Sequence, residues 1–258
     1  MTTRRDAILK EMGLTPIWKS RAIGTGAIGT GGPANAPVPP VPPGGFVEDE
    51  EPVAQTPSVA REARIAKMEW PELKAVVPSC TACGLHKSRT QTVFGVGDEN
   101  ADWLLVGEAP GAEEDQKGEP FVGVAGRLLD AMLSSIHLAR DNNVYIANVL
   151  KCRPPGNRNP DSTEVAQCSP HLLRQVSLIK PKLIVAMGRF AAQTLLATDA
   201  SIASLRGRVH TYHGVPLIVT YHPAYLLRTP ADKAKSWQDL TFAVRTMGGL
   251  QEAVPVPT

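Results

Sequence analysis

The sequence predicts a three-layer α/β/α fold, in which helices cover both faces of a central four-stranded, mainly parallel sheet. Short apolar runs at residues 103–106, 144–148, 183–187 and 217–220 have the length and composition of buried strands. Helical apolar spacing fills the gaps after them, at residues 126–138, 163–179, 190–198 and 233–247. Strands that alternate with helices in this way form parallel sheets covered on both sides.

The chain before this alternation has a different composition. Residues 5–20 show the apolar spacing of a short amphipathic helix, so we expect an amphipathic peptide over residues 1–22. Residues 23–68 are rich in Gly, Pro and Ala and predict a disordered linker, because they cannot bury enough apolar surface to order themselves. Two interpretations stay open: the peptide docks on a protein partner, or the extension is a plain disordered tail.

The folded domain is expected at residues 69–250, followed by a tail at residues 251–258. It opens with a short helical segment at residues 71–80, and the helix after Asp161 carries a D-x-x-E capping box with Glu164. A chain of 258 residues with 20% charged residues and a net charge of +2 suits one soluble domain with additions.

No apolar run reaches membrane-spanning length, and the first residues, MTTRRDAILKEMG, lack the apolar core of a secretory signal. We therefore expect a cytoplasmic protein with no membrane association, and a monomer.

The connection between the first predicted strand and the helix after it is unusually long. It runs through GEAPGAEEDQKGEPFVG and exceeds the usual two to six residues of such a connection several-fold. Gly107 and Gly111 let the backbone approach a bound molecule closely, and the carboxyl ends of parallel strands are where ligands bind in open sheets. Neither phosphate-binding glycine motif is present and carboxylates repel phosphate, so a neutral ligand is expected. A solvated loop is the alternative.

Polar side chains follow two other predicted strands. Asn148 offers an amide donor and acceptor together, and His222 follows the fourth strand, so both project towards the edge where Gly107 lies. His222 is therefore a candidate catalytic donor. From the residues alone, Asn148 capping a loop, a structural His222 and a core Phe121 are the alternatives.

Cys80, Cys83, Cys152 and Cys168 are the only cysteines. A C-x-x-C pair plus two more cysteines in a cytoplasmic chain suggests a metal site rather than disulfides. Zinc and an iron–sulfur cluster both accept four thiolates, and spacing does not separate them. Four unrelated cysteines that include a redox pair are the third possibility.

Four motifs in order, GEAPGAEED, GEPFVGVAGRLLD, NVLKCRPPGNRNP and HPAYLLR, carry a family resemblance. Over about Pro78 to Leu240 the chain resembles the iron–sulfur uracil-DNA glycosylases, the family 4 branch of that superfamily. The resemblance implies a [4Fe–4S] cluster on the four cysteines, with a structural role. It also implies that Asn148 reads uracil, that Phe121 stacks on the flipped base, and that His222 assists the leaving base.

The resemblance places Gly107, Glu108 and Ala109 in the substrate-binding loop. Ala109 stands where the more familiar uracil-DNA glycosylases have a water-activating aspartate, and Gly111 where they have a tyrosine that excludes thymine. Glu108 and Glu114 are therefore the candidates for both tasks. Five arginines are candidates for contacts with the DNA backbone. They are Arg153, Arg158, Arg206, Arg208 and Arg228.

The expected function is a DNA repair glycosylase that flips uracil out of DNA and hydrolyses its N-glycosidic bond, leaving an abasic site. Two alternatives stay open. One is a relative that traps its product covalently on a histidine in an inserted loop, although KCRPPGNRNPDSTE has neither histidine nor insertion. The other is a non-enzymatic iron–sulfur module that binds nucleic acid or assists a polymerase.

Overall fold

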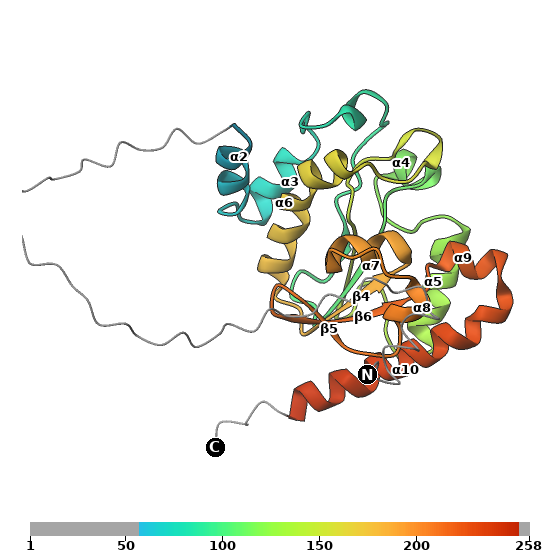
Figure 1. Ribbon diagram of the computed structural model, residues 1–258. Helices are drawn as coiled ribbons and strands as arrows, with labels where there is room; N and C mark the ends of the chain where they lie inside the picture. Colours follow the sequence, from blue (N-terminus) through green and yellow to red (C-terminus); the bar gives the residue numbers. More distant parts are fainter. Residues whose placement is uncertain (1–56, 253–258) are drawn as a thin grey trace, which may run out of the picture. The chain divides into compact units, whose positions relative to one another are not determined.

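A six-stranded sheet forms the centre of the computed structural model, which describes residues 57–252 (Figure 1). The strand order is β1-β3-β2-β4-β6-β5. The strands are β1 (Val96–Gly97), β2 (Trp103–Gly107), β3 (Val144–Asn148), β4 (Leu183–Met187), β5 (His210–Tyr212) and β6 (Val215–Thr220). The four inner strands β3, β2, β4 and β6 are parallel, which confirms the predicted core of the sheet.

The two edge strands were not predicted. β1 pairs antiparallel with β3, and β5 pairs antiparallel with β6. They have only two and three residues and are partly exposed, so neither produces the apolar run that marks a buried strand. The sheet therefore has six strands, whereas the sequence indicated four.

Helices cover both faces of the sheet, as expected. Helices α5 (Val124–Ser134) and α10 (Lys233–Glu252) pack on the face that carries Trp103 and Leu105. Helices α6 (Ser162–Ile179), α7 (Arg189–Leu196) and α8 (Ile202–Leu205) pack on the face that carries Leu104 and Val106. Alternate residues of one buried strand thus serve two cores.

The remaining helices are short. They are α2 (Pro57–Ile65), α3 (Trp70–Val76), α4 (Ala112–Lys117), α9 (Pro223–Arg228) and the 3-10 turns η1 (Gly84–Lys87), η2 (Pro155–Asn157) and η3 (Pro230–Asp232). The predicted capping box of α6 is confirmed. The Asp161 carboxylate accepts from the Thr163 N–H at 2.8 Å, and the Glu164 carboxylate accepts from the Asp161 N–H at 2.9 Å.

Helix α2 corrects the predicted boundary between linker and domain. It lies within residues 23–68, yet Ile65 and Met68 are buried against Leu73. Arg61 also donates to the Gln167 carbonyl of α6 at 3.0 Å. Residues 57–68 therefore belong to the folded part, because their few apolar side chains pack on a distant helix instead of forming a core of their own.

At the other end, α10 reaches Glu252, so residues 251–252 of the expected tail are helical. The predicted peptide at residues 1–22, the linker before residue 57 and the last six residues lie outside the described residues. Within residues 57–252, no helix is long and apolar enough to cross a membrane.

Candidate active site

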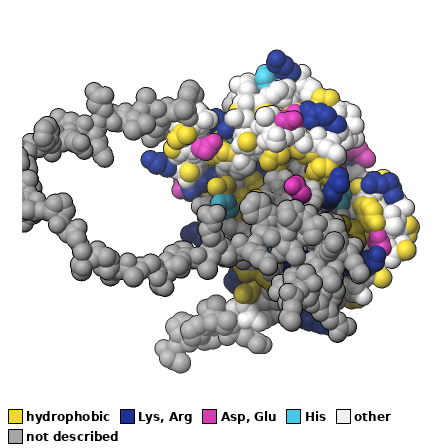
Figure 2. Space-filling model, in the orientation of Figure 1, with side chains coloured by type: hydrophobic (Ala, Val, Ile, Leu, Met, Phe, Trp, Pro, Cys, Tyr) yellow, Lys and Arg dark blue, Asp and Glu magenta, His cyan; other side chains and the backbone are white. Residues whose placement is uncertain are grey.

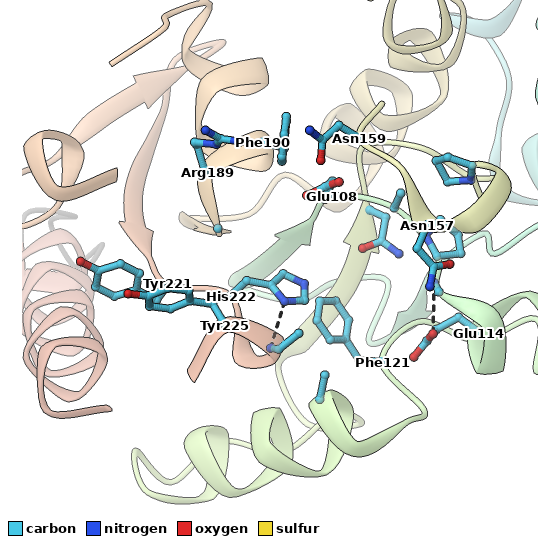
Figure 3. A pocket seen from close by; sticks show the side chains of 18 of the residues that line it. Glu108, Glu114, Phe121, Asn157, Asn159, Arg189, Phe190, Tyr221, His222 and Tyr225 are labelled. Carbon is cyan, nitrogen blue, oxygen red and sulfur yellow. Dashed lines mark hydrogen bonds between the residues drawn. The ribbon is translucent and has the colours of Figure 1, made fainter. Parts of the chain in front are cut away.

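A cavity of about 720 Å³ opens at the carboxyl edge of the sheet, where β2, β3, β4 and β6 end. It brings together most of the predicted site residues (Figure 3). Those that line it are Glu108, Ala109, Glu114, Phe121, Asn148, Arg158, His222 and Arg228. The expectation that strand ends converge on one site therefore holds for this edge.

Gly107 leaves the space that two of these side chains occupy. A β-carbon on Gly107 would lie 2.4 Å from Asn148 Oδ1 and 2.7 Å from the Phe121 ring. Asn148 is 2% exposed, and its Oδ1 accepts no hydrogen bond within the protein. Buried polar atoms are nearly always paired, so an unpaired acceptor on the wall of a cavity marks a place for a donor from a ligand.

Phe121 and His222 form the stacked wall of the cavity. Their ring centroids lie 5.3 Å apart with an interplanar angle of 29°. Figure 3 shows the two side chains next to each other in the pocket. His222 stands at the N-terminus of α9, where its Nδ1 accepts from the Ala224 N–H at 3.1 Å. The neutral ring therefore keeps its proton on Nε2, which is free to donate.

The surroundings of His222 keep it neutral. Burial, together with a smaller effect of the positive charge of Arg228, lowers the pKa of His222 to about 4, although Glu114 acts in the opposite direction. Gly188 closes in behind the ring, since a β-carbon there would lie 2.8 Å from His222 Cβ. The site thus presents a neutral imidazole donor at pH 7.

The two carboxylates of the long loop have different roles. Glu114 accepts from the Gly111, Val122 and Gly123 N–H groups at 3.1, 3.0 and 3.3 Å, and so ties the two ends of the loop together. Glu108 makes no such bonds. Burial raises the pKa of Glu108 to about 7, with Arg189 holding it lower. Of the two candidates, Glu108 is therefore the carboxylate suited to accept a proton near neutral pH.

The predicted DNA-contacting arginines are engaged to different degrees. Arg158 binds both oxygens of Glu164, at 2.9 and 2.5 Å, and Arg206 binds Asp239 at 2.6 Å while its guanidinium lies 4.8 Å from the centre of the Tyr221 ring. Arg153 donates to Asn157 at 2.7 Å, and Arg208 donates to the Ser204 carbonyl. Of these five, only Arg158 and Arg228 line the cavity.

Lys and Arg side chains occur at several separate places on the face seen in Figure 2, with acidic side chains between them. The role of these arginines in DNA binding stays a prediction.

Several residues of the cavity were missed. Arg189 and Phe190 follow β4, Asn157 and Asn159 come from the loop after β3, and Tyr225 comes from α9. The rule that strand ends meet at one edge would have found Arg189 and Phe190, because they come directly after a predicted strand. No comparable signal marks the other three.

All four cysteines line a second, smaller cavity. They are free thiols, and three of them accept hydrogen bonds: Cys152 from Arg89 at 3.1 Å, Cys168 from the Lys151 N–H at 3.2 Å, and Cys80 from Arg61 at 3.6 Å. Thiols that converge beside three cationic side chains fit an anionic group held by thiolates. Among the described residues, no three His, Cys, Asp or Glu side chains form a group that could hold a single metal ion.

An unpaired amide, a neutral imidazole donor and an aromatic ring in one cavity suit a planar, neutral ligand with its own donors and acceptors, which is the chemistry of a nucleobase. Comparison with known proteins agrees with this class. The model of the Uracil DNA glycosylase superfamily matches residues 94–241.

Individual relatives indicate the branch of this superfamily. The Type-4 uracil-DNA glycosylase of Archaeoglobus fulgidus is 49% identical over 162 residues, which cover 60% of this chain and 81% of the relative. That of Pyrobaculum aerophilum is 41% identical over 183 residues, which cover 68% and 93%. A Type-5 uracil-DNA glycosylase of P. aerophilum is 33% identical over 146 residues, which cover 50% and 64%. The chain belongs to the type-4 uracil-DNA glycosylases.

Proposed function

We propose that this enzyme removes uracil from DNA by hydrolysing its N-glycosidic bond, with the base held in the cavity between Phe121 and Asn148. The relatives are named uracil-DNA glycosylases, enzymes that release the intact base by hydrolysing its bond to the sugar, and the unpaired Asn148 Oδ1 is the observation that carries the assignment to this cavity. Uracil presents an N–H donor beside a carbonyl acceptor, which matches the acceptor and donor of one amide.

Each pocket residue has a task in this reaction. Phe121 stacks on the flipped base, and Asn148 reads its edge. His222 donates its Nε2 proton in a hydrogen bond to the uracil carbonyl next to the breaking bond, where negative charge grows as the base leaves. A donor aimed at that charge stabilises the transition state more than the bound substrate.

Glu108 orients and deprotonates the attacking water, and as a carboxylate it stabilises the positive charge that develops on the sugar. Glu114 helps to position Glu108, because its hydrogen bonds hold the loop closed around the cavity. The rejection of thymine is assigned to the same loop, because Glu108, Ala109 and Glu114 all line the cavity.

The proposal extends to the cysteines. Cys80, Cys83, Cys152 and Cys168 would hold a [4Fe–4S] cluster, as the family resemblance implies, and its contribution is structural cross-linking. It would join the segment around η1 to the loop after β3 and to α6, which both lie much further along the chain. Lys151 lies between the two cavities.

A uracil-release assay tests the function against its alternatives. Protein is mixed with single- and double-stranded oligonucleotides that carry one uracil, and matched oligonucleotides with thymine serve as controls. We expect free uracil and an abasic site from the uracil strands only. A stable protein–DNA adduct would instead identify a covalent trapping protein, and binding without release would identify a non-enzymatic module.

One structural observation already weighs against covalent trapping. The loop after β3 reaches the cavity through Pro154, Asn157, Arg158 and Asn159, none of which is a nucleophile for the sugar. Amide and guanidinium groups at this place can hydrogen-bond to DNA, but they do not form a covalent bond with it.

A further inference from the structure

The backbone of Phe121 is in a conformation that needs support. Its φ angle is +56°, in the left-handed region that residues with a β-carbon rarely adopt. Its carbonyl oxygen is packed into the first turn of α5, where a β-carbon on Gly126 would lie only 1.7 Å away. This conformation puts the ring, 5% exposed, against His222 and next to Gly107.

One side chain outside the cavity holds this part of the loop. The Arg140 guanidinium donates to the Pro120 carbonyl at 2.9 Å, to the Phe121 carbonyl at 2.5 Å and to the Gly126 carbonyl at 3.5 Å. Its Nε donates to the Asp130 carboxylate at 2.5 Å, which fixes the plane of the guanidinium. Four acceptors on one planar group leave it little freedom.

Arg140 is itself anchored to the sheet. It lies in the turn before β3, where Ala139 and Asn142 form a bridge, and its carbonyl lies 2.9 Å from the place of a β-carbon on Gly97 in β1. The arginine therefore connects the turn before β3, close to the edge of the sheet, to the loop that carries Phe121.

We propose that Arg140 is a positioning residue for base recognition: by binding the carbonyls of Pro120 and Phe121 it keeps Phe121 in the left-handed conformation that presents its ring to the flipped base. This inference rests on the proposed stacking role of Phe121. Arg140 itself does not line the cavity and does not touch the substrate. Without the Arg140 guanidinium, the loop can relax to a negative φ at Phe121, and the ring then leaves the position in which it stacks on the base.

A double-mutant cycle in single-turnover excision tests this. The variants are Arg140→Met, Phe121→Ala and the two combined, each compared for maximal rate and for the uracil-DNA concentration at half saturation. Arg140→Met alone should raise the half-saturating concentration and lower the rate, each about tenfold or less. In the Phe121→Ala background the same change should have almost no further effect, because the ring it positions is absent.

Asp130→Asn is the matched control. It removes the negative charge beside Arg140 but leaves an amide oxygen that can accept from Arg140 Nε, and it keeps the three carbonyl contacts, so it should stay close to the parent enzyme. Thermal melting of every variant checks the fold. If Arg140→Met does not fold, the cycle is repeated with Arg140→Lys, which retains a single charged donor and should show a smaller version of the same pattern.

The outcomes separate this inference from the proposed function. If Phe121→Ala lowers excision but Arg140→Met matches the parent, or if the two effects multiply in the double variant, Arg140 does not act through Phe121 and the inference is wrong. If Phe121→Ala excises uracil at the parent rate and affinity, Phe121 has no stacking role and this inference is wrong as well. The glycosylase activity of the parent enzyme, measured in the uracil-release assay, is not affected by that outcome.

Discussion

The cavity that holds Phe121, Asn148 and His222 (the base cavity) and the cavity that holds the four cysteines (the cysteine cavity) lie on either side of the segment from Asn148 to Cys152, and they differ in the groups that line them. Around the base cavity, burial favours neutral forms, since it lowers the pKa of His222 to about 4 and raises that of Glu108 to about 7. Around the cysteines burial acts in the same direction, since it lowers the pKa of Lys151 to about 8 and raises that of Cys168. There, however, the side chains of Arg61, Arg89 and the fully buried Lys151 surround the thiols with cationic groups. One cavity suits a neutral guest and the other an anionic group.

Lys151 connects the two. Its backbone N–H donates to Cys168 Sγ at 3.2 Å, while its side-chain ammonium donates to the Asn148 carbonyl at 2.9 Å and to Gln175 Oε1 at 2.6 Å. Asn148, which we propose reads the base, is thus held through its backbone carbonyl by the residue that contacts Cys168. The cysteine region therefore supports the backbone at Asn148 without contributing a side chain to the base cavity.

The largest effect is expected from removing a thiol. Cys168→Ser should abolish the brown colour and the iron and sulfide of anaerobically purified protein, and should lower the melting temperature strongly, because the site would lose a ligand and its cross-link. Absorbance and iron analysis measure this. Stoichiometric zinc without iron in the parent protein would contradict the [4Fe–4S] cluster and the proposed difference between the two cavities.

A smaller effect is expected at Glu108. The uracil excision rate at low substrate should rise with pH through about 7, as Glu108 loses its proton and becomes a base. Glu108→Gln should be about 10²-fold slower and lack this rise. Arg189→Gln should move the midpoint to higher pH, because Arg189 holds the pKa of Glu108 down. A midpoint that stays in place in Glu108→Gln would assign the titration to another group.

The same shift has a consequence for stability. The pKa of Glu108 is raised in the folded protein from its ordinary 4.5, so its contribution to folding is present below pH 4.5 and is lost as pH rises through about 7. Glu108→Gln should therefore flatten the dependence of the melting temperature on pH across this window.

A paired substitution compares the two cavities in stability alone. Asn148→Ala removes an acceptor that has no partner, so the melting temperature should hardly change while uracil-DNA binding weakens. Arg89→Met removes donors to Cys152 Sγ and to the Cys80 and Pro78 carbonyls, and the melting temperature should fall by several degrees. If both variants lose the same amount of melting temperature, the base cavity contributes to stability as much as the cysteine cavity does, and the proposed difference between a ligand pocket and a structural site is wrong.

The smallest effect is expected from removing only the part of the N-terminal extension that precedes α2. Deleting residues 1–56 should leave excision and melting unchanged, whereas deleting residues 1–68 should lower the melting temperature by more than about 5 °C. The longer deletion removes the buried Ile65 and Met68 and the contact of Arg61 with Cys80. If both truncations behave alike, α2 is not part of the glycosylase domain.

Part of the fold and of the candidate site could be predicted from the sequence. The four inner strands and the meeting of Gly107, Asn148 and His222 were predictable, because buried apolar runs mark strands and parallel strands end at one edge. Helix α2 was not predictable, because its few apolar side chains become buried only when α2 packs near α6, more than 100 residues away in sequence. The roles of Arg140 and Lys151 were equally hidden, because both depend on backbone carbonyls that the fold turns towards them.

The most direct test of the account concerns His222, the neutral donor on which the proposed chemistry depends. His222→Ala and the matched control His213→Ala, whose side chain is exposed and does not line the cavity, are compared in single-turnover excision and in equilibrium binding of uracil-DNA. His222→Ala should lower the rate by about 10²-fold or more with almost unchanged affinity, while His213→Ala matches the parent. A near-parental rate in His222→Ala would show that another group stabilises the departing uracil and would contradict the mechanism proposed for this cavity.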